Sequence, residues 1–232
     1  MDQTKITVKV HEPLLKSFGE RLESCFIKRD AFLNHMIKSE TRELKQEMKG
    51  LKLSKKARLH ISRELQRLGT KTINVVVDKD TAEGLNSVVK KANMVRDAFI
   101  NRLILFLNAP EQLLKILELP AQVNDRRLSS AESISTSPLR GIQSIIFDPL
   151  FYLRTAPAIE RGYGLYRITL PQINLPSMVR PMTLEGMSCY IDDSDIRGTA
   201  EWKKKQKEDD EFEMMTKLLW PTQTEEGTKD AK

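Results

Sequence analysis

The sequence predicts a mainly α-helical protein built around a two-stranded antiparallel ribbon, followed by a small α+β region at the C-terminal end. Three observations lead to this fold class. The string RDAFLN at 29–34 returns as RDAFIN at 96–101. Each copy follows a short strand pattern and an amphipathic helix pattern. Beyond residue 140 the chain has shorter apolar runs broken by prolines.

The repeat extends far beyond the shared string. When residue 6 is placed on residue 73, an offset of 73 − 6 = 67, nine of 32 aligned positions are identical without a gap. Unrelated sequence would give roughly two identities, and self-similarity at a fixed offset is the mark of an internal repeat. The chain therefore contains a duplicated unit.

Each unit begins with a strand. The segments KITVKV (5–10) and TINVVV (72–77) alternate, which puts every second residue on one face of a strand. The apolar faces are formed by Ile6, Val8 and Val10 in one copy and by Ile73, Val75 and Val77 in the other. We expect both faces to be buried against helices.

A helix follows each strand. Pro13 suits the first turn of the first one, and Asp80 is expected to be the N-cap of its counterpart. Asn93 is expected to adopt a left-handed conformation where the second of these helices ends. The apolar stripes are Leu14, Phe18 and Leu22, and then Leu85, Val88, Val89 and Ala92.

A second helix begins with the shared string in each copy. Its apolar residues are Phe32, Leu33, Met36 and Ile37, matched by Phe99, Ile100, Leu103 and Ile104. One strand and two helices leave a strand without hydrogen-bonding partners, so a single unit is not a stable domain. Two units can pair their strands and pack four helices behind them. The sequence leaves open whether the strands pair within one chain or between two.

These residues resemble a known family. The alternating strand at 5–10 and the helix starts KRDAFLNHMI and VRDAFINRLI are similar to the ribbon-helix-helix DNA-binding proteins of the Arc and MetJ type. The resemblance covers residues 3–38 and 70–107. It implies a tandem pseudo-dimer whose ribbon enters the major groove of double-stranded DNA.

The resemblance implies a base-reading role for the outward side chains of the ribbon. A two-stranded ribbon fits the major groove, where lysines can donate to guanine and asparagine can pair with adenine. The alternative is that these residues are only the solvent face of the ribbon. The six candidates are Lys5, Thr7, Lys9, Thr72, Asn74 and Val76.

Phosphate contacts are expected at the starts of the second helices, where free N–H groups attract anions. The candidates there are Lys28, Arg29 and Arg96, with ordinary surface ion pairs as the alternative for the arginines. Asp30 and Asp97 are expected to cap or balance the helix dipole.

The segment between the repeats is basic. Ser54 is expected to cap a helix with the stripe Ala57, Ile61, Leu65 and Leu68 that ends at Gly69. Its cations favour either a further phosphate-binding arm or a solubilising helical spacer. The phosphate candidates here are Lys52, Lys55 and Lys56.

We divide the chain by these patterns. The predicted units are repeat 1 (1–38), a basic helical spacer (39–69), repeat 2 with an extra short helix (70–125), a Ser-rich linker (126–140), an α+β region (141–220) and a disordered tail (221–232). Tyr166, Ile168 and Leu170 are expected on one strand face, and 201–220 is expected to be a charged helix.

Composition limits the function further. Residues 1–109 hold 22 Lys and Arg against 13 Asp and Glu, a balance of 22 − 13 = +9, while the remainder is slightly acidic. A basic first half favours a polyanion as partner. No apolar run or N-terminal leader pattern indicates a membrane or secretion, so we expect a cytoplasmic, nucleoid-associated protein.

Enzymatic and cofactor chemistry is not expected. The histidines are scattered, and the acidic run at 192–195 is interpreted as a turn more readily than as a metal site. His35 is expected to be structural, and Cys189 a small buried residue. We therefore predict no catalytic residue, no metal and no cofactor.

Two functional classes remain. The first is a sequence-specific DNA-binding regulator, such as a repressor of a bacterium or mobile element, whose second half serves self-association or partner binding. The second is an antitoxin-like adaptor or an accessory protein of plasmid DNA processing, which holds a protein partner through residues 103–220. Both follow from the resemblance, since the family includes repressors, antitoxins and accessory proteins.

Overall fold

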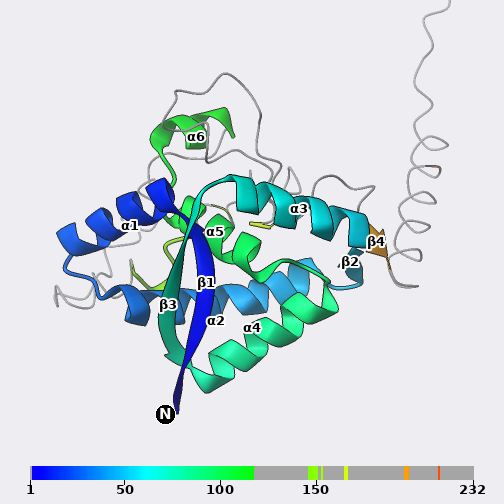
Figure 1. Cartoon of the computed structure of the whole chain (residues 1–232), viewed down its shortest axis with the longest axis horizontal. Coiled ribbons are helices and arrows are strands. Elements are labelled where there is room, and N and C mark those ends of the chain that lie inside the picture. Colours follow the sequence, from blue (N-terminus) through cyan, green and yellow to red (C-terminus); the bar gives the residue numbers. More distant parts are fainter. Residues whose placement is uncertain are drawn as a thin grey trace, which may run out of the picture.

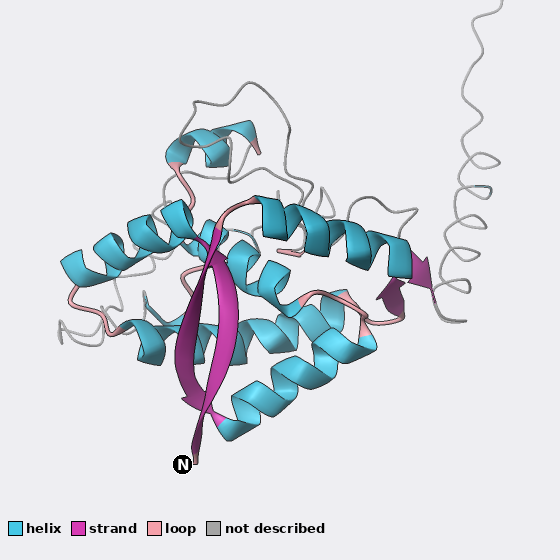
Figure 2. Cartoon of the chain, in the orientation of Figure 1, coloured by secondary structure: helices cyan, strands magenta, loops and turns pink. Residues whose placement is uncertain are grey.

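The computed structural model describes residues 2–117, 146–150, 153, 165–166, 196–198 and 214. The expected fold class is confirmed at the level of a mainly helical chain with a two-stranded antiparallel ribbon (Figures 1 and 2). The elements, in chain order, are β1 (Gln3–His11), α1 (Glu12–Ser24), α2 (Arg29–Glu47), β2 (Leu51–Leu53), α3 (Lys55–Arg67), β3 (Thr70–Asp78), α4 (Lys79–Lys91), α5 (Arg96–Leu107), α6 (Glu111–Ile116) and β4 (Ile196–Gly198).

The ribbon is formed by β1 and β3, which pair antiparallel within the one chain. Thr7 lies opposite Asn74, and these two positions are repeat counterparts because 7 + 67 = 74. The alternating burial along both strands confirms the expected apolar faces. Their buried members are Ile6, Val8, Val10, Ile73, Val75 and Val77.

The four repeat helices cover the apolar side of the ribbon, which lies in front of them in Figure 1. Helix α2 contacts β3 and α4, whereas α5 contacts β1 and α1. The second helix of each copy therefore packs on the strand and first helix of the other copy. The expected stripes of α1, α2, α4 and α5 are buried in this core, apart from Phe32 and Val89, which are half-buried.

The turns confirm several local predictions and correct one. Asn93 has a φ of 54°, and its repeat counterpart Phe26 has a φ of 58°. The Ser54 hydroxyl accepts a hydrogen bond from the Ala57 N–H at 3.0 Å, and α3 is followed by Gly69 at a φ of 66°. Asp80, however, is not the N-cap of α4.

Helix α4 begins two residues earlier than expected, at Lys79, so that the capping position belongs to Asp78. The Asp78 carboxylate does not cap the helix and instead accepts a hydrogen bond from Asn34 Nδ2. Helix α2 also differs from expectation, because it continues to Glu47, beyond the boundary of repeat 1 placed at residue 38. Its additional turns bury Glu40, Thr41 and Leu44.

Part of the second half packs onto the repeat core. Tyr166 is fully buried, its ring stacks on Phe99 with centroids 5.0 Å apart, and its hydroxyl donates to Glu40 Oε2 at 3.3 Å. Arg102 Nε donates to the Leu165 carbonyl at 2.6 Å. Leu165 and Tyr166 lie in a turn rather than in the expected strand.

The remaining predictions for the second half mostly lie outside the described residues. These include the linker at 126–140, the acidic run at 192–195, Cys189, nearly all of the helix at 201–220 and the tail at 221–232. Helix α6 confirms the expected short helix after residue 110. His35 contacts the second half, since its Nε2 is 3.1 Å from the Phe147 carbonyl oxygen.

Candidate nucleic-acid interface

The outward face of the ribbon brings the six base-reading candidates together. Five are exposed and Val76 is half-buried. The two central residues contact each other, because Thr7 Oγ1 donates to Asn74 Oδ1 at 2.9 Å. The cross-strand pairs are Lys5 with Val76, Thr7 with Asn74, and Lys9 with Thr72. Both lysines therefore lie on β1, and β3 contributes no charge to this row.

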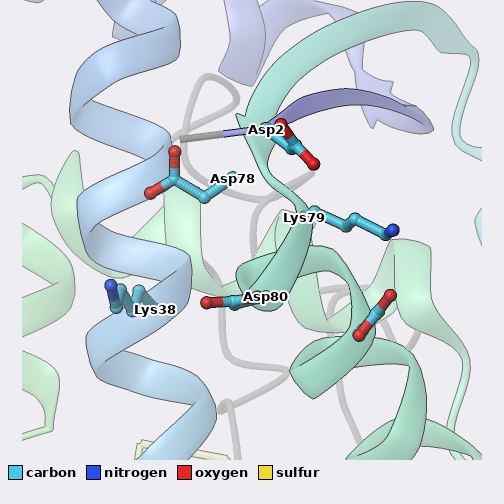
Figure 3. A pocket seen from close by; sticks show the side chains of 6 residues that line it. Asp2, Lys38, Asp78, Lys79 and Asp80 are labelled. Atoms are coloured by element: carbon cyan, nitrogen blue, oxygen red, sulfur yellow. The ribbon is translucent and has the colours of Figure 1, made fainter.

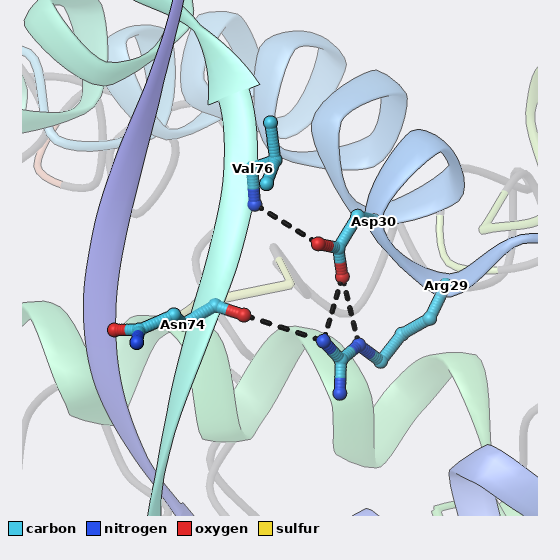
Figure 4. Close-up of polar contacts among 4 residues, drawn as sticks. All are labelled: Arg29, Asp30, Asn74 and Val76. Carbon is cyan, nitrogen blue, oxygen red and sulfur yellow. Dashed lines mark hydrogen bonds and ion pairs between the residues drawn. The ribbon is translucent and has the colours of Figure 1, made fainter.

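The repeated arginines hold the ribbon from its edges. Arg29 Nη2 donates to the Asn74 carbonyl at 3.2 Å, while Arg29 Nε donates to Asp30 at 2.8 Å (Figure 4). Arg96 Nη2 donates to the Thr7 carbonyl at 2.6 Å. Since Thr7 and Asn74 are repeat counterparts, each arginine binds the strand of the opposite copy at the equivalent position.

The repeated aspartates also bind the strand of the opposite copy. They do not cap their helices, contrary to what the sequence had suggested. Asp30 Oδ2 accepts the Val76 N–H at 3.1 Å (Figure 4), and Asp97 accepts the Lys9 N–H. No side-chain capping hydrogen bond is present at the start of α2 or α5. Burial raises the pKa of Asp97, although the Lys9 N–H and the charges of Arg96 and Lys9 act in the opposite direction.

The repeated asparagines complete the pattern. Asn34 exchanges hydrogen bonds with Asp78, accepting from its backbone N–H at 2.9 Å. Asn101 is fully buried, accepts the His11 N–H at 2.8 Å and donates to the Lys9 carbonyl at 2.7 Å. The shared string thus supplies an Arg, an Asp and an Asn that each bind the backbone of the opposite strand.

We expect Asn101→Ala to reduce the free energy of unfolding by about 2–4 kcal/mol, because it leaves backbone groups of β1 without their partner in the core. Urea unfolding followed by circular dichroism measures this. Asn86→Ala, at an exposed position of α4, is the matched control and should change stability by less than about 0.5 kcal/mol. Equal stability of the two variants would contradict the role given to Asn101.

The phosphate candidates divide into two groups on opposite sides of the ribbon (Figure 1). Lys28 is exposed at the N-cap of α2, beside Arg29, at the corner between α1 and α2. Lys52 on β2 and Lys55 and Lys56 in the first turn of α3 are exposed near the corner between α4 and α5. Arg29 and Arg96 are half-buried because they also reach the ribbon.

A hollow at one end of the ribbon is lined mainly by acidic residues, in contrast to the basic phosphate candidates. Its volume is about 350 Å³, and Figure 3 shows that α2, the N-terminal end of the chain and the start of α4 contribute its lining. Four acids and two lysines line it: Asp2, Asp78, Asp80, Glu83, Lys38 and Lys79. An acidic surface repels phosphates, so this end is not part of the candidate interface. Among the described residues, no group of His, Cys, Asp or Glu is arranged to hold a metal ion.

Comparison with known proteins gives no assignment, since no family model, curated protein or solved structure matches this chain. Within the described part of the chain, no helix combines the length and the apolar character needed to cross a membrane.

The apolar run at 103–117, considered as a partner site or as the seat of the second half, is largely internal. Leu103, Ile104, Leu105 and Phe106 are buried, and the preceding Arg102 binds the Leu165 carbonyl. Most of this run therefore lies in the core of the described chain.

Proposed function

We propose that this protein is a sequence-specific double-stranded DNA-binding protein of the ribbon-helix-helix type, in which both halves of the pseudo-dimer belong to one chain. The ribbon enters the major groove and its outward side chains contact base edges. The most fitting role is a transcriptional regulator, such as a cytoplasmic, nucleoid-associated repressor.

The observation that carries the proposal is the exchange of backbone contacts between the copies. Arg29, Asp30 and Asn34 bind β3, and their counterparts bind β1. These contacts hold the ribbon edges from behind and leave five of the six outward residues exposed to solvent. A rigid ribbon with a polar outer face matches the depth and donor pattern of the major groove.

The outward row also predicts the form of the DNA target. Repeat counterparts differ along it, since Lys5 corresponds to Thr72 and Lys9 to Val76. Identical subunits read palindromes because their contacts are related by a two-fold axis. This ribbon breaks that symmetry, so its two half-sites should differ in sequence.

Selection from a pool of random-sequence DNA duplexes tests the proposal. The full-length protein should enrich one motif of roughly one helical turn whose halves are unlike, and binding should weaken as salt rises. Enrichment of a perfect palindrome would refute the asymmetric readout. Failure to enrich any motif, with no measurable affinity for duplex DNA, would refute the proposed function.

A further inference from the structure

The two corners that flank the ribbon are repeat counterparts with different surroundings. We call residues 25–28 the α1–α2 corner and residues 92–95 the α4–α5 corner. At the first, Phe26 is 96% exposed, and Lys28 precedes α2. At the second, Val95 takes the place of Lys28, so the repeat itself supplies one cation fewer beside the start of α5.

The spacer covers the α4–α5 corner through specific contacts. The Leu53 N–H donates to the Ala92 carbonyl at 2.9 Å, and Asn93 Nδ2 donates to the Leu53 carbonyl at 2.8 Å. Arg58 Nη1 donates to Asn93 Oδ1 at 3.0 Å. Figure 1 shows β2 and the beginning of α3 beside the end of α4. The left-handed Asn93 is therefore the residue to which the spacer is attached.

This attachment brings many positive charges to one place. No acidic residue occurs from 49 to 63 or from 84 to 96, and the first turn of α3 has none. The last turn of α4 adds Lys90 and Lys91, both exposed. The resulting basic surface, which we call the spacer surface, consists of Lys52, Lys55, Lys56, Arg58, Lys90 and Lys91.

We propose that the spacer surface is a second DNA-backbone binding site, which supplies beside repeat 2 the cationic contact that Lys28 supplies in repeat 1 and that Val95 cannot make. The proposal rests on the proposed DNA-binding function. Exposed lysines with no acidic residue beside them in the sequence bind a phosphate chain favourably, because they displace its counterions. DNA lying along the ribbon passes both corners, since these flank the ribbon on opposite sides (Figure 1). The protein would then bind the backbone on one flank through Lys28 and on the other through an inserted strand and helix.

The test compares salt dependence of binding to a mixed-sequence duplex of about 30 base pairs, roughly three helical turns. The variant Lys52→Gln/Lys55→Gln/Lys56→Gln leaves the contacts of Asn93 and Arg58 intact. The control Lys16→Gln/Lys45→Gln/Lys115→Gln removes the same charge from exposed lysines of α1, α2 and α6. Anisotropy of the labelled duplex gives the slope of log affinity against log salt.

We expect the slope of the spacer variant to fall by up to about 2.7, or about 0.9 for each lost phosphate contact, and the slope of the control to remain near wild type. On the selected motif, hydroxyl-radical protection should disappear from one flank in the spacer variant and from the opposite flank in Lys28→Gln. Equal slopes for the spacer variant and the control, with wild type still binding, would overturn this inference alone. If wild type binds neither duplex, the proposed function fails with it.

Discussion

In the variant Lys5→Ala/Lys9→Ala, the free energy of binding to the specific DNA site should weaken by about 2–6 kcal/mol. Each lysine can donate a hydrogen bond to guanine, and one good base contact contributes about 1–3 kcal/mol. Weak, salt-dependent binding to unrelated DNA should remain, since it arises from phosphate contacts elsewhere. Both side chains are exposed on the outer face of β1, and the neighbouring backbone contacts of the ribbon do not use them. The measurement is competition between the selected motif and a scrambled duplex.

A variant of equal charge separates base reading from general attraction. Lys16→Ala/Lys45→Ala removes two exposed lysines of α1 and α2 and should keep the preference for the motif. If it lowers the preference as strongly as Lys5→Ala/Lys9→Ala, then overall charge, and not the ribbon, accounts for the binding. Unfolding curves of both variants should match wild type, because exposed substitutions change stability little.

The second large effect is expected at Tyr166. Tyr166→Ala should lower the free energy of unfolding by about 3–5 kcal/mol, since the ring is fully buried against Phe99 and its removal leaves a cavity. It would also remove the hydroxyl that donates to the buried Glu40. Urea unfolding measures the loss.

Two further variants show which part of the Tyr166 side chain accounts for the loss and whether any change in the second half has the same effect. Tyr166→Phe keeps the ring and removes only the hydroxyl, so a loss of about 1–3 kcal/mol is expected. Met214→Ala, at an exposed helical position of the second half, should be close to neutral. Wild-type stability of Tyr166→Ala would show that the second half does not contribute to the core. The predicted loss would mean that removal of the second half also destabilises the repeat core.

The sequence predicted the ribbon, the order of the repeat helices and their buried stripes because each depends on local periodicity. The two-residue period of a strand puts Ile6, Val8 and Val10 on one face. The spacing of an α-helix puts Leu14, Phe18 and Leu22 on one face of α1. The cap formed by Ser54 and the left-handed conformation of Asn93 were also predictable, since both features favour particular residue types.

The partners of the shared string were not predictable in the same way. Its identity at two places indicated a common role, but helix starts suggested capping for Asp30 and Asp97. Their carboxylates instead bind strand N–H groups from the opposite copy, a contact separated by 46 residues for Asp30. Such long-range contacts depend on the tertiary arrangement, which periodicity does not describe. Strand β2 was not predicted for the same reason. It consists of only Leu51–Leu53, and it is held by the hydrogen bond from Leu53 to Ala92 and by its pairing with β4.

The exchange of packing between the copies also shows that neither copy is complete alone. Because α2 rests on β3 and α5 rests on β1, a lone copy would lack both the second strand of its ribbon and the surface that its second helix covers. A single copy could complete this arrangement only by pairing with a second copy. Because both copies lie in one chain, a substitution in β1 is not repeated in β3. Lys5 and Lys9 of β1, whose counterparts in β3 are Thr72 and Val76, are such unshared positions.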